Sequence, residues 1–186
     1  ISELVSYYGS HDTSAKIRKQ LEWTKEDKAL IWTEIVSEKI KQQALLLERY
    51  GENEANMLYG YMSEVEFGDI TNREGHAAKV YFNALFGKSF TRTDEIPTNA
   101  ALNYGYSIIL SLFNREIVSS GYLTQIGLFH DNMFNQFNLA SDFMEPFRPL
   151  IDEIVYNNQN YEFDRIQKYK LIDVLNNKVK INGKEQ

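Results

Sequence analysis

One histidine and three carboxylates provide side chains that can bind a divalent cation. His130 lies in the stretch Gly127–Pro149 (GLFHDNMFNQFNLASDFMEPFRP), ahead of a segment with helical character that carries Asp142 and Glu145. Because three residues make nearly one helical turn, both carboxylates are expected on one helix face, within reach of one cation. Glu74, on an upstream helical stretch, would supply a further ligand if the fold brings the two stretches together.

Two or three carboxylates and one imidazole form a hard, oxygen-rich ligand set. Such a set suits Mg²⁺ or Mn²⁺, and the imidazole favours Mn²⁺. Because these ions in proteins mostly serve phosphate groups, phosphodiester chemistry is the natural use of the site. The nearby side chains that would meet DNA phosphates, or donate hydrogen bonds to DNA, are Asn72, Arg73, Lys79, Tyr81, Arg92 and Arg148.

The same carboxylates have an alternative interpretation as helix caps. Glu74 follows Thr71 by three residues, which is the spacing of a capping box. Acidic residues in a first helical turn, such as Asp142 and Glu145, are favoured by the helix dipole. On spacing alone this interpretation is the stronger one, and it describes a non-catalytic helical interaction module. Neither a glycine-rich phosphate loop nor a nucleophile elbow offers another chemistry.

The composition is that of one globular domain without a membrane span. The 186 residues contain 43% hydrophobic side chains and carry a formal net charge of −6. No cysteine is present, which excludes disulfides and thiolate zinc sites and fits a cytoplasmic location. The acidic total argues weakly against a nucleic-acid partner. Residues 67–115, however, have five basic and four acidic side chains, so a basic groove near the carboxylates remains compatible with the sequence.

The spacing of apolar residues predicts about seven helices and almost no strand, so the expected class is all-α, as a single helical domain. The expected helices span residues 12–23, 24–50, 53–65, 71–86, 97 to 115 or slightly beyond, 138 or 141 to 156, and 163–175. In the sixth helix, a start near Asp142 would accommodate Pro146, and Pro149 then predicts a kink.

The end of the chain predicts a short β-hairpin arm. Val179 and Ile181 have strand character, and the pair Asn182-Gly183 is typical of a tight hairpin turn. Because the chain stops soon after this turn and begins with Ile1, we expect it to be a fragment of a longer protein.

Three segments together resemble the CRISPR-associated integrase of the spacer-adaptation complex, the "Cas-one" family. They are Glu74–Phe82 (EGHAAKVYF), Asn99–Tyr106 (NAALNYGY), and Gly127–His130 followed by Leu139–Pro149 (LASDFMEPFRP). Their order and spacing agree with the family pattern throughout. The last segment is most similar to the form found beside type II effector nucleases.

The resemblance implies an all-helical catalytic domain, comprising residues 1–186, that binds a divalent metal through Glu74, His130 and Glu145, with Asp142 beside them. The family joins the 3′-hydroxyl ends of prespacer DNA to the CRISPR repeat by transesterification and also cleaves branched DNA. It acts with a small CRISPR-associated subunit and forms a homodimer. The dimer is made through an N-terminal β-rich domain that is not recognisable in this chain. His130 would be a metal ligand, a proton carrier or both.

Overall fold

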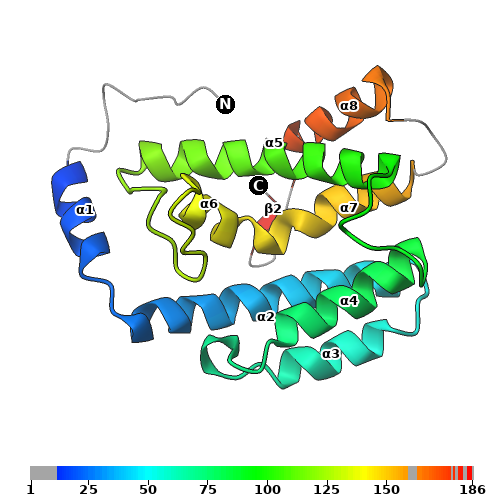
Figure 1. Ribbon diagram of the computed structural model, residues 1–186, viewed down its shortest axis with the longest axis horizontal. Helices are drawn as coiled ribbons and strands as arrows, with labels where there is room; N and C mark the ends of the chain where they lie inside the picture. The colour runs from blue at the N-terminus through cyan, green and yellow to red at the C-terminus, as the bar shows by residue number, and fades with distance from the viewer. Residues whose placement is uncertain (1–11, 159–162, 177, 179, 182–183, 186) are drawn as a thin grey trace.

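The computed structural model describes residues 12–158, 163–176, 178, 180–181 and 184–185. Within these residues, regular structure consists of eight α-helices, three 3₁₀ segments and two short strands (Figure 1). In chain order they are α1 Thr13–Leu21, α2 Lys25–Arg49, α3 Ala55–Ser63, η1 Phe67–Asp69, α4 Arg73–Phe86, α5 Pro97–Ser119, α6 Asn138–Phe143, η2 Glu145–Phe147, α7 Arg148–Tyr156, α8 Arg165–Ile172, η3 Asp173–Asn176, β1 Lys180–Ile181 and β2 Lys184–Glu185. The predicted all-α class is confirmed.

Local signals place most of the helix ends. Thr24 caps α2 in a capping box with Asp27, whose backbone N–H and side chain both bond to the threonine. Gly51, at φ 73°, follows α2 and allows the chain to leave the helix in the left-handed region. Pro97 occupies the first turn of α5, where its missing N–H costs no hydrogen bond.

The prediction of one helix from residue 138 or 141 to 156, kinked at Pro149, is wrong in that the segment is broken rather than only kinked. The segment is divided into α6, η2 and α7, and this division is why eight α-helices are described where seven were expected. Pro146 and Pro149 each lie in the first positions of a new helical segment, because neither can donate to a preceding turn. Asp142 therefore lies in the last turn of α6 and Glu145 begins η2, so the two carboxylates lie on opposite sides of a break.

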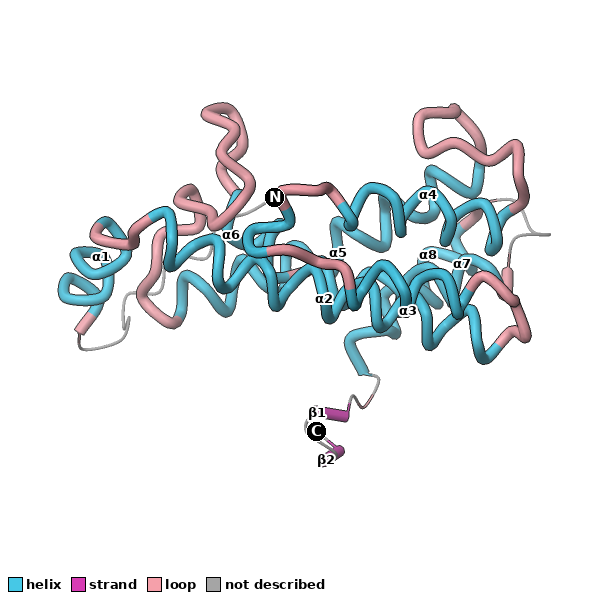
Figure 2. Tube along the Cα trace, turned by 90° about the horizontal axis from the view of Figure 1, so that it is seen from below, coloured by secondary structure: helices cyan, strands magenta, loops and turns pink. Residues whose placement is uncertain are grey.

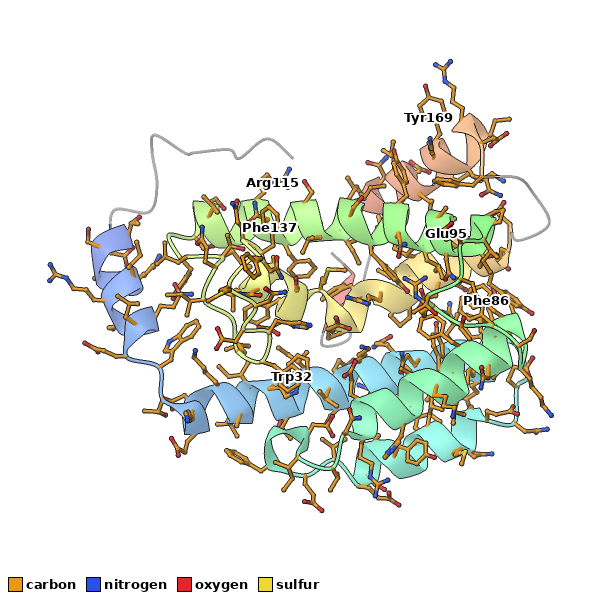
Figure 3. All side chains as sticks on the ribbon, viewed as in Figure 1. Trp32, Phe86, Glu95, Arg115, Phe137 and Tyr169 are labelled. Carbon is orange, nitrogen blue, oxygen red and sulfur yellow. The ribbon has the colours of Figure 1, made fainter. Side chains whose placement is uncertain are left out.

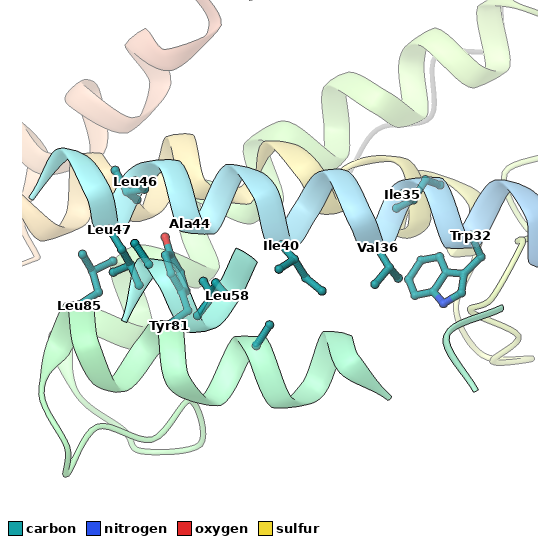
Figure 4. Packing of buried hydrophobic residues seen from close by; sticks show 12 residues of the cluster. Trp32, Ile35, Val36, Ile40, Ala44, Leu46, Leu47, Leu58, Tyr81 and Leu85 are labelled. Carbon is teal, nitrogen blue, oxygen red and sulfur yellow. The ribbon is translucent and has the colours of Figure 1, made fainter. Parts of the chain in front are cut away.

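Helix α2 lies at the centre of the fold. Figure 4 shows its apolar face packed against α3 and α4, with Leu47 close to Leu58 and Tyr81 and with Ile40 and Val36 further along α2. On its other side α2 contacts η2 and α7. Consequently α4 and η2, which carry Glu74 and Glu145, both pack on the same helix.

A second apolar cluster joins α5 to α7 and α8, with Leu102, Ile109, Ile151 and Leu171 fully or nearly fully buried. The α6–η2–α7 segment runs between α5 and α2 in Figure 1, and both helices contact it. This segment therefore links the two clusters, and its position fixes where Glu145 lies.

Strands β1 and β2 pair antiparallel, with Lys180 opposite Glu185 and Ile181 opposite Lys184. Figure 2 shows the pair apart from the helices. The strands flank the predicted turn, whereas Val179 and the turn residues 182–183 lie outside the described part of the chain. Across the described residues, no helix combines the length and the apolar character needed to cross a membrane.

Close packing of α5 on α7 predicts a specific sensitivity at Gly105. A Cβ atom there would lie 2.4 Å from Cγ2 of the buried Ile151. We expect Gly105→Ala to lower the free energy of unfolding by about 1–3 kcal/mol, because the core must shift to accept it. Gly60→Ala is the matched control, since that helical glycine has no atom within 4 Å of the added Cβ. It should raise stability by about 0.4–1 kcal/mol. Urea denaturation measures both, and equal effects would contradict the described packing.

Candidate metal centre

Lys39 joins the two halves of the candidate centre. It lies on α2, is 5% exposed, and its ammonium group donates hydrogen bonds to Oε1 of Glu74 and Oε2 of Glu145. These partners are 35 and 106 residues away in the sequence. Two carboxylates from distant segments thus converge on one positive charge. Arg148 adds a second cation, with Nη2 2.8 Å from Oε1 of Glu145.

Glu74 is available to Lys39 because other residues cap α4. The predicted capping box of Thr71 and Glu74 is wrong, since the N-cap is Asn72, in the left-handed region at φ 54°. The carboxylate of Asp69 accepts hydrogen bonds from the backbone N–H groups of Arg73 and Glu74, at 2.7 and 3.1 Å. Both Asn72 and Asp69 satisfy the start of the helix, so the Glu74 side chain is not required there.

Asp142 arranges the backbone around His130. It is fully buried, and its two oxygens accept hydrogen bonds from the N–H groups of Leu128, Phe129 and His130 at 2.6, 3.3 and 3.1 Å. Its Oδ1 also lies 2.7 Å from Nδ1 of His130. The capping interpretation is wrong for Asp142, which makes no helix-cap hydrogen bond. Its carboxylate is turned to the loop, whereas that of Glu145 is turned to Lys39, so the expectation that both face one cation is wrong.

The loop before α6 is packed against α2 by aromatic rings. Phe129 stacks on Trp32 with ring centroids 4.4 Å apart and an interplanar angle of 3°. The His130 ring meets the same indole edge-on, at 6.0 Å. Figure 3 shows Trp32 on α2 beside this loop. Gly127 permits the close turn, because a Cβ there would lie 2.3 Å from the carbonyl oxygen of His130.

The charges of the centre shift the pKa values of two groups. Burial opposes ionisation of Glu74, but the charge and hydrogen bond of Lys39, with contributions from Arg148 and His130, outweigh it and lower the pKa of this carboxyl. The hydrogen bond from the His130 ring to Asp142, against the opposing effect of burial, raises the imidazole pKa. The negative charge of Glu145 acts in the same direction. The three predicted ligands therefore interact electrostatically.

The ligand atoms of the three residues fit a hard divalent cation, and the carboxylates of Glu74 and Glu145 already face one cation position. Glu74 and Glu145 supply carboxylate oxygens and His130 an imidazole, the mixture expected for Mg²⁺ or Mn²⁺. In the described part of the chain, however, no three acidic or histidine side chains form a metal-binding cluster. The ammonium group of Lys39 lies between the two carboxylates, where a metal ion bound to both would lie.

Four of the predicted DNA-contacting residues belong to, or directly flank, the segments that carry Glu74 and Glu145. Asn72 and Lys79 are exposed on or before α4. Arg73 is partly exposed and pairs with Glu64 at 3.0 Å. The Arg148 guanidinium lies over the ring of Tyr106, 4.7 Å from its centroid.

The two other predicted DNA contacts bond to side chains of the protein itself. The expectation that Tyr81 contacts DNA is wrong, because its side chain is fully buried and donates a hydrogen bond to Asp152 at 2.9 Å. Arg92 donates hydrogen bonds to Asn99 and Asn103, and its guanidinium lies over the ring of Tyr106. Arg92 therefore braces the start of α5.

Sequence reasoning missed Lys39 and Asp152. Lys39 had a detectable signal, since it lies three residues after Val36 and one before Ile40, on the apolar stripe of a long helix. A lysine on such a stripe requires a buried partner. Asp152 has a similar position between Ile151 and Val155 on α7, and its burial raises the pKa of its carboxyl to about 6.

Comparison with known protein families shows to which family this chain belongs. The family model described as CRISPR associated protein Cas1 matches residues 3–170. The chain belongs to the Cas1 family. This confirms the resemblance seen in the sequence. The CRISPR-associated endonuclease Cas1 of Neisseria meningitidis serogroup C (strain 8013) is 44% identical over 147 residues, which cover 78% of this chain and 48% of that relative. The chain therefore spans about half the length of this Cas1 relative.

Solved structures share the fold. A casposase bound to integration product matches with a TM-score of 0.76 and 22% identity, over 94% of this chain and 64% of that one. A chain of a partial Cas6-RT-Cas1–Cas2 complex matches with a TM-score of 0.71 and 20% identity, over 90% and 64%. At these identities the likeness shows the Cas1 fold alone.

The Asp142–His130 pair predicts a measurable pH dependence. We expect Asp142→Asn to lower the imidazole pKa of His130, because the hydrogen bond that favours the charged ring loses its anionic acceptor. NMR titration of the histidine ring signals measures the change. Asp131→Asn is the matched control, since it removes an exposed carboxylate next to His130 in the sequence and should move the midpoint much less.

The Asp142–His130 pair also determines how the free energy of unfolding depends on pH. The folded pKa of His130 is raised above the ordinary value of 6.5. The pair therefore stabilises the fold in full below that value, and its contribution is lost as the pH rises through the folded pKa. An unchanged His130 midpoint in Asp142→Asn would contradict the described contact.

Proposed function

We propose that this chain is the catalytic part of a metal-dependent DNA integrase and endonuclease of CRISPR adaptation. It would hold Mg²⁺ or Mn²⁺ through Glu74, His130 and Glu145, and join the 3′-hydroxyl ends of prespacer DNA to the CRISPR repeat. The observation that carries the proposal is the convergence of Glu74 and Glu145, from α4 and η2, on one cation position. His130 lies close enough for its charge to affect Glu74.

Names of related proteins support this activity and its partners. The Neisseria relative is named an endonuclease, and the casposase of similar fold is bound to integration product. Another chain of similar fold belongs to a complex that contains Cas2. By this likeness we infer that the full-length protein acts on DNA together with a small CRISPR-associated subunit. The homodimer is proposed from the family resemblance in the sequence.

The reaction would be a transesterification that needs no nucleotide cofactor. The 3′-hydroxyl oxygen of the prespacer forms a bond to a repeat phosphorus, the bond from that phosphorus to the 3′-oxygen of the repeat breaks, and one proton passes from the attacking to the leaving oxygen. A bound divalent ion would supply electrostatic stabilisation of the charge that develops on the phosphate.

The chain's own residues prepare this site for the reaction. Asp142 accepts a hydrogen bond at Nδ1 of His130, so the neutral ring carries its proton there and leaves Nε2 to bind a metal or take a proton. Arg148 contacts Oε1 of Glu145 and holds its carboxylate in place. Asp142 acts here as a positioning residue, because both its oxygens are engaged by the loop.

The contacts of the carboxylates support this function over the alternative of a non-catalytic helical module. It required the carboxylates to act as helix caps, yet Glu74 and Glu145 bond to Lys39 and Asp142 bonds to the His130 loop. Neither α6 nor η2 has a side-chain cap.

The proposal predicts loss of activity in three variants of the complete protein. Glu74→Gln, His130→Ala and Glu145→Gln should each reduce Mn²⁺-dependent strand transfer into a repeat duplex by more than about 100-fold, the upper range for residues that only support metal ligands. Glu38→Gln is the matched control, since this glutamate of α2 bonds to Lys41 and Gln42 at the surface and should leave the rate unchanged. Undiminished transfer in the three site variants would refute the proposed function.

A further inference from the structure

The cation position between Glu74 and Glu145 belongs, in this structure, to Lys39. Its ammonium group is within hydrogen-bonding distance of one oxygen from each carboxylate. Its side chain is 7% exposed, and that of Glu145 is 4% exposed. An ammonium group so poorly hydrated is stable only when its charge is matched by close anions. The two glutamates supply that match.

Lys39 and a divalent ion cannot both lie between these oxygens. Mg²⁺ binds oxygen at about 2.0–2.1 Å, which is closer than an ammonium hydrogen bond. An ion shared by Glu74 and Glu145 would therefore occupy the volume of the ammonium group. Two cations at such short range also repel each other strongly in a site with little water. Binding of the ion between the two carboxylates thus requires the ammonium group to leave.

The remaining contacts of the carboxylates allow this exchange. Arg148 contacts Oε1 of Glu145, whereas Lys39 contacts Oε2, so the arginine can retain this carboxylate when the lysine moves. The start of α4 is capped by Asn72 and Asp69, so Glu74 stays on its helix turn without Lys39. Each carboxylate therefore keeps support on its own segment when the ammonium group leaves, but the pair loses the positive charge between its two members.

We propose that Lys39 is the resident cation of the centre. It keeps Glu74 and Glu145 together before a divalent ion arrives, and the ion displaces it on binding. Lys39 is thus a positioning residue that lowers the affinity for metal by competing for the same oxygens. This inference rests on the proposed function, because it assumes that a divalent ion binds between these two carboxylates.

Calorimetry with Mn²⁺ alone tests the proposal in two steps. The wild-type chain should bind Mn²⁺ and Glu145→Gln should not. Failure of this first step refutes the metal centre itself. The second step compares Lys39→Met, which keeps the length and apolar stem of the side chain, with the wild type. We expect the dissociation constant for Mn²⁺ to fall by about 5- to 150-fold, the usual range over which one bound group changes the affinity for another.

Thermal melting without metal gives the complementary readout. Lys39→Met should have a lower melting temperature than the wild type in the absence of metal, and a larger increase on addition of Mn²⁺, because both carboxylates lose their ion pair with the ammonium group and Glu145 keeps only its pair with Arg148. Lys41→Met is the matched control, since Lys41 lies two residues further along α2 and pairs with Glu38 at the surface, at 3.0 Å. It should change neither quantity. Unchanged or weaker Mn²⁺ binding by Lys39→Met, with the wild type and Glu145→Gln as expected, overturns the inference and leaves the metal centre intact.

A measurement on the wild-type chain does not depend on the folding of Lys39→Met. Buried ammonium protons exchange slowly enough with water to give an NMR signal. The signal of Lys39 is the one that is missing from the spectrum of Lys39→Arg. Addition of Mg²⁺ should shift or remove the Lys39 signal as the group leaves the two carboxylates. A Lys39 signal that stays unchanged at saturating Mg²⁺ would refute the proposal that the ion displaces the ammonium group.

Discussion

The placement of one buried ammonium group constrains the whole centre. Lys39 lies on the inner side of α2, and a charge at that depth is tolerated only with close anionic partners. Glu74 must therefore approach from α4 and Glu145 from η2. The apolar contacts of α2 with both segments bring them into range. The ion pairs then select one register among the packings that the apolar faces would allow.

A second constraint acts on the segment that carries His130. Residues 120–137 form no helix or strand, so side chains must satisfy their backbone groups. Asp142 accepts hydrogen bonds from three backbone N–H groups in the middle of this loop. Gln20 of α1 satisfies the backbone near the beginning of the loop. Its side chain accepts a hydrogen bond from the N–H of Leu123 at 2.8 Å and donates one to the carbonyl oxygen of Leu123 at 2.7 Å. Two buried polar side chains thus give an irregular loop a defined position beside α2.

The sequence predicts the helices well because their ends depend on neighbours in the chain. Thr24, Gly51 and Pro97 act locally, and each marks a helix end in the structure. The division of the segment after Asn138 was predicted only as a kink, because a proline signals a break without showing how the chain resumes.

The site was harder to predict, because its residues depend on distant partners. Spacing could not decide whether Thr71 or Asn72 caps α4, since the left-handed backbone of Asn72 is not visible in the sequence. The capping interpretation of Glu74 followed from that ambiguity. Lys39 is one lysine among many in the sequence, and only the fold shows that it faces two carboxylates. Resemblance to a family proposed Glu74, His130 and Glu145 as ligands, whereas spacing alone favoured a capping role, which the structure contradicts for Glu74 and Asp142.

The second core cluster also determines the geometry of the centre, through Arg148. Its guanidinium bonds to Glu145 on one side and lies over the ring of Tyr106 on the other. Tyr106 donates a hydrogen bond to Asp152, which also accepts one from Tyr81 on α4. Burial raises the pKa of both phenols, so they remain donors, and their hydrogen bonds oppose the effect of burial on Asp152. Because α4, α5 and α7 meet at this carboxylate, a shift of any one of them would move Arg148, and with it the carboxylate that pairs with Lys39.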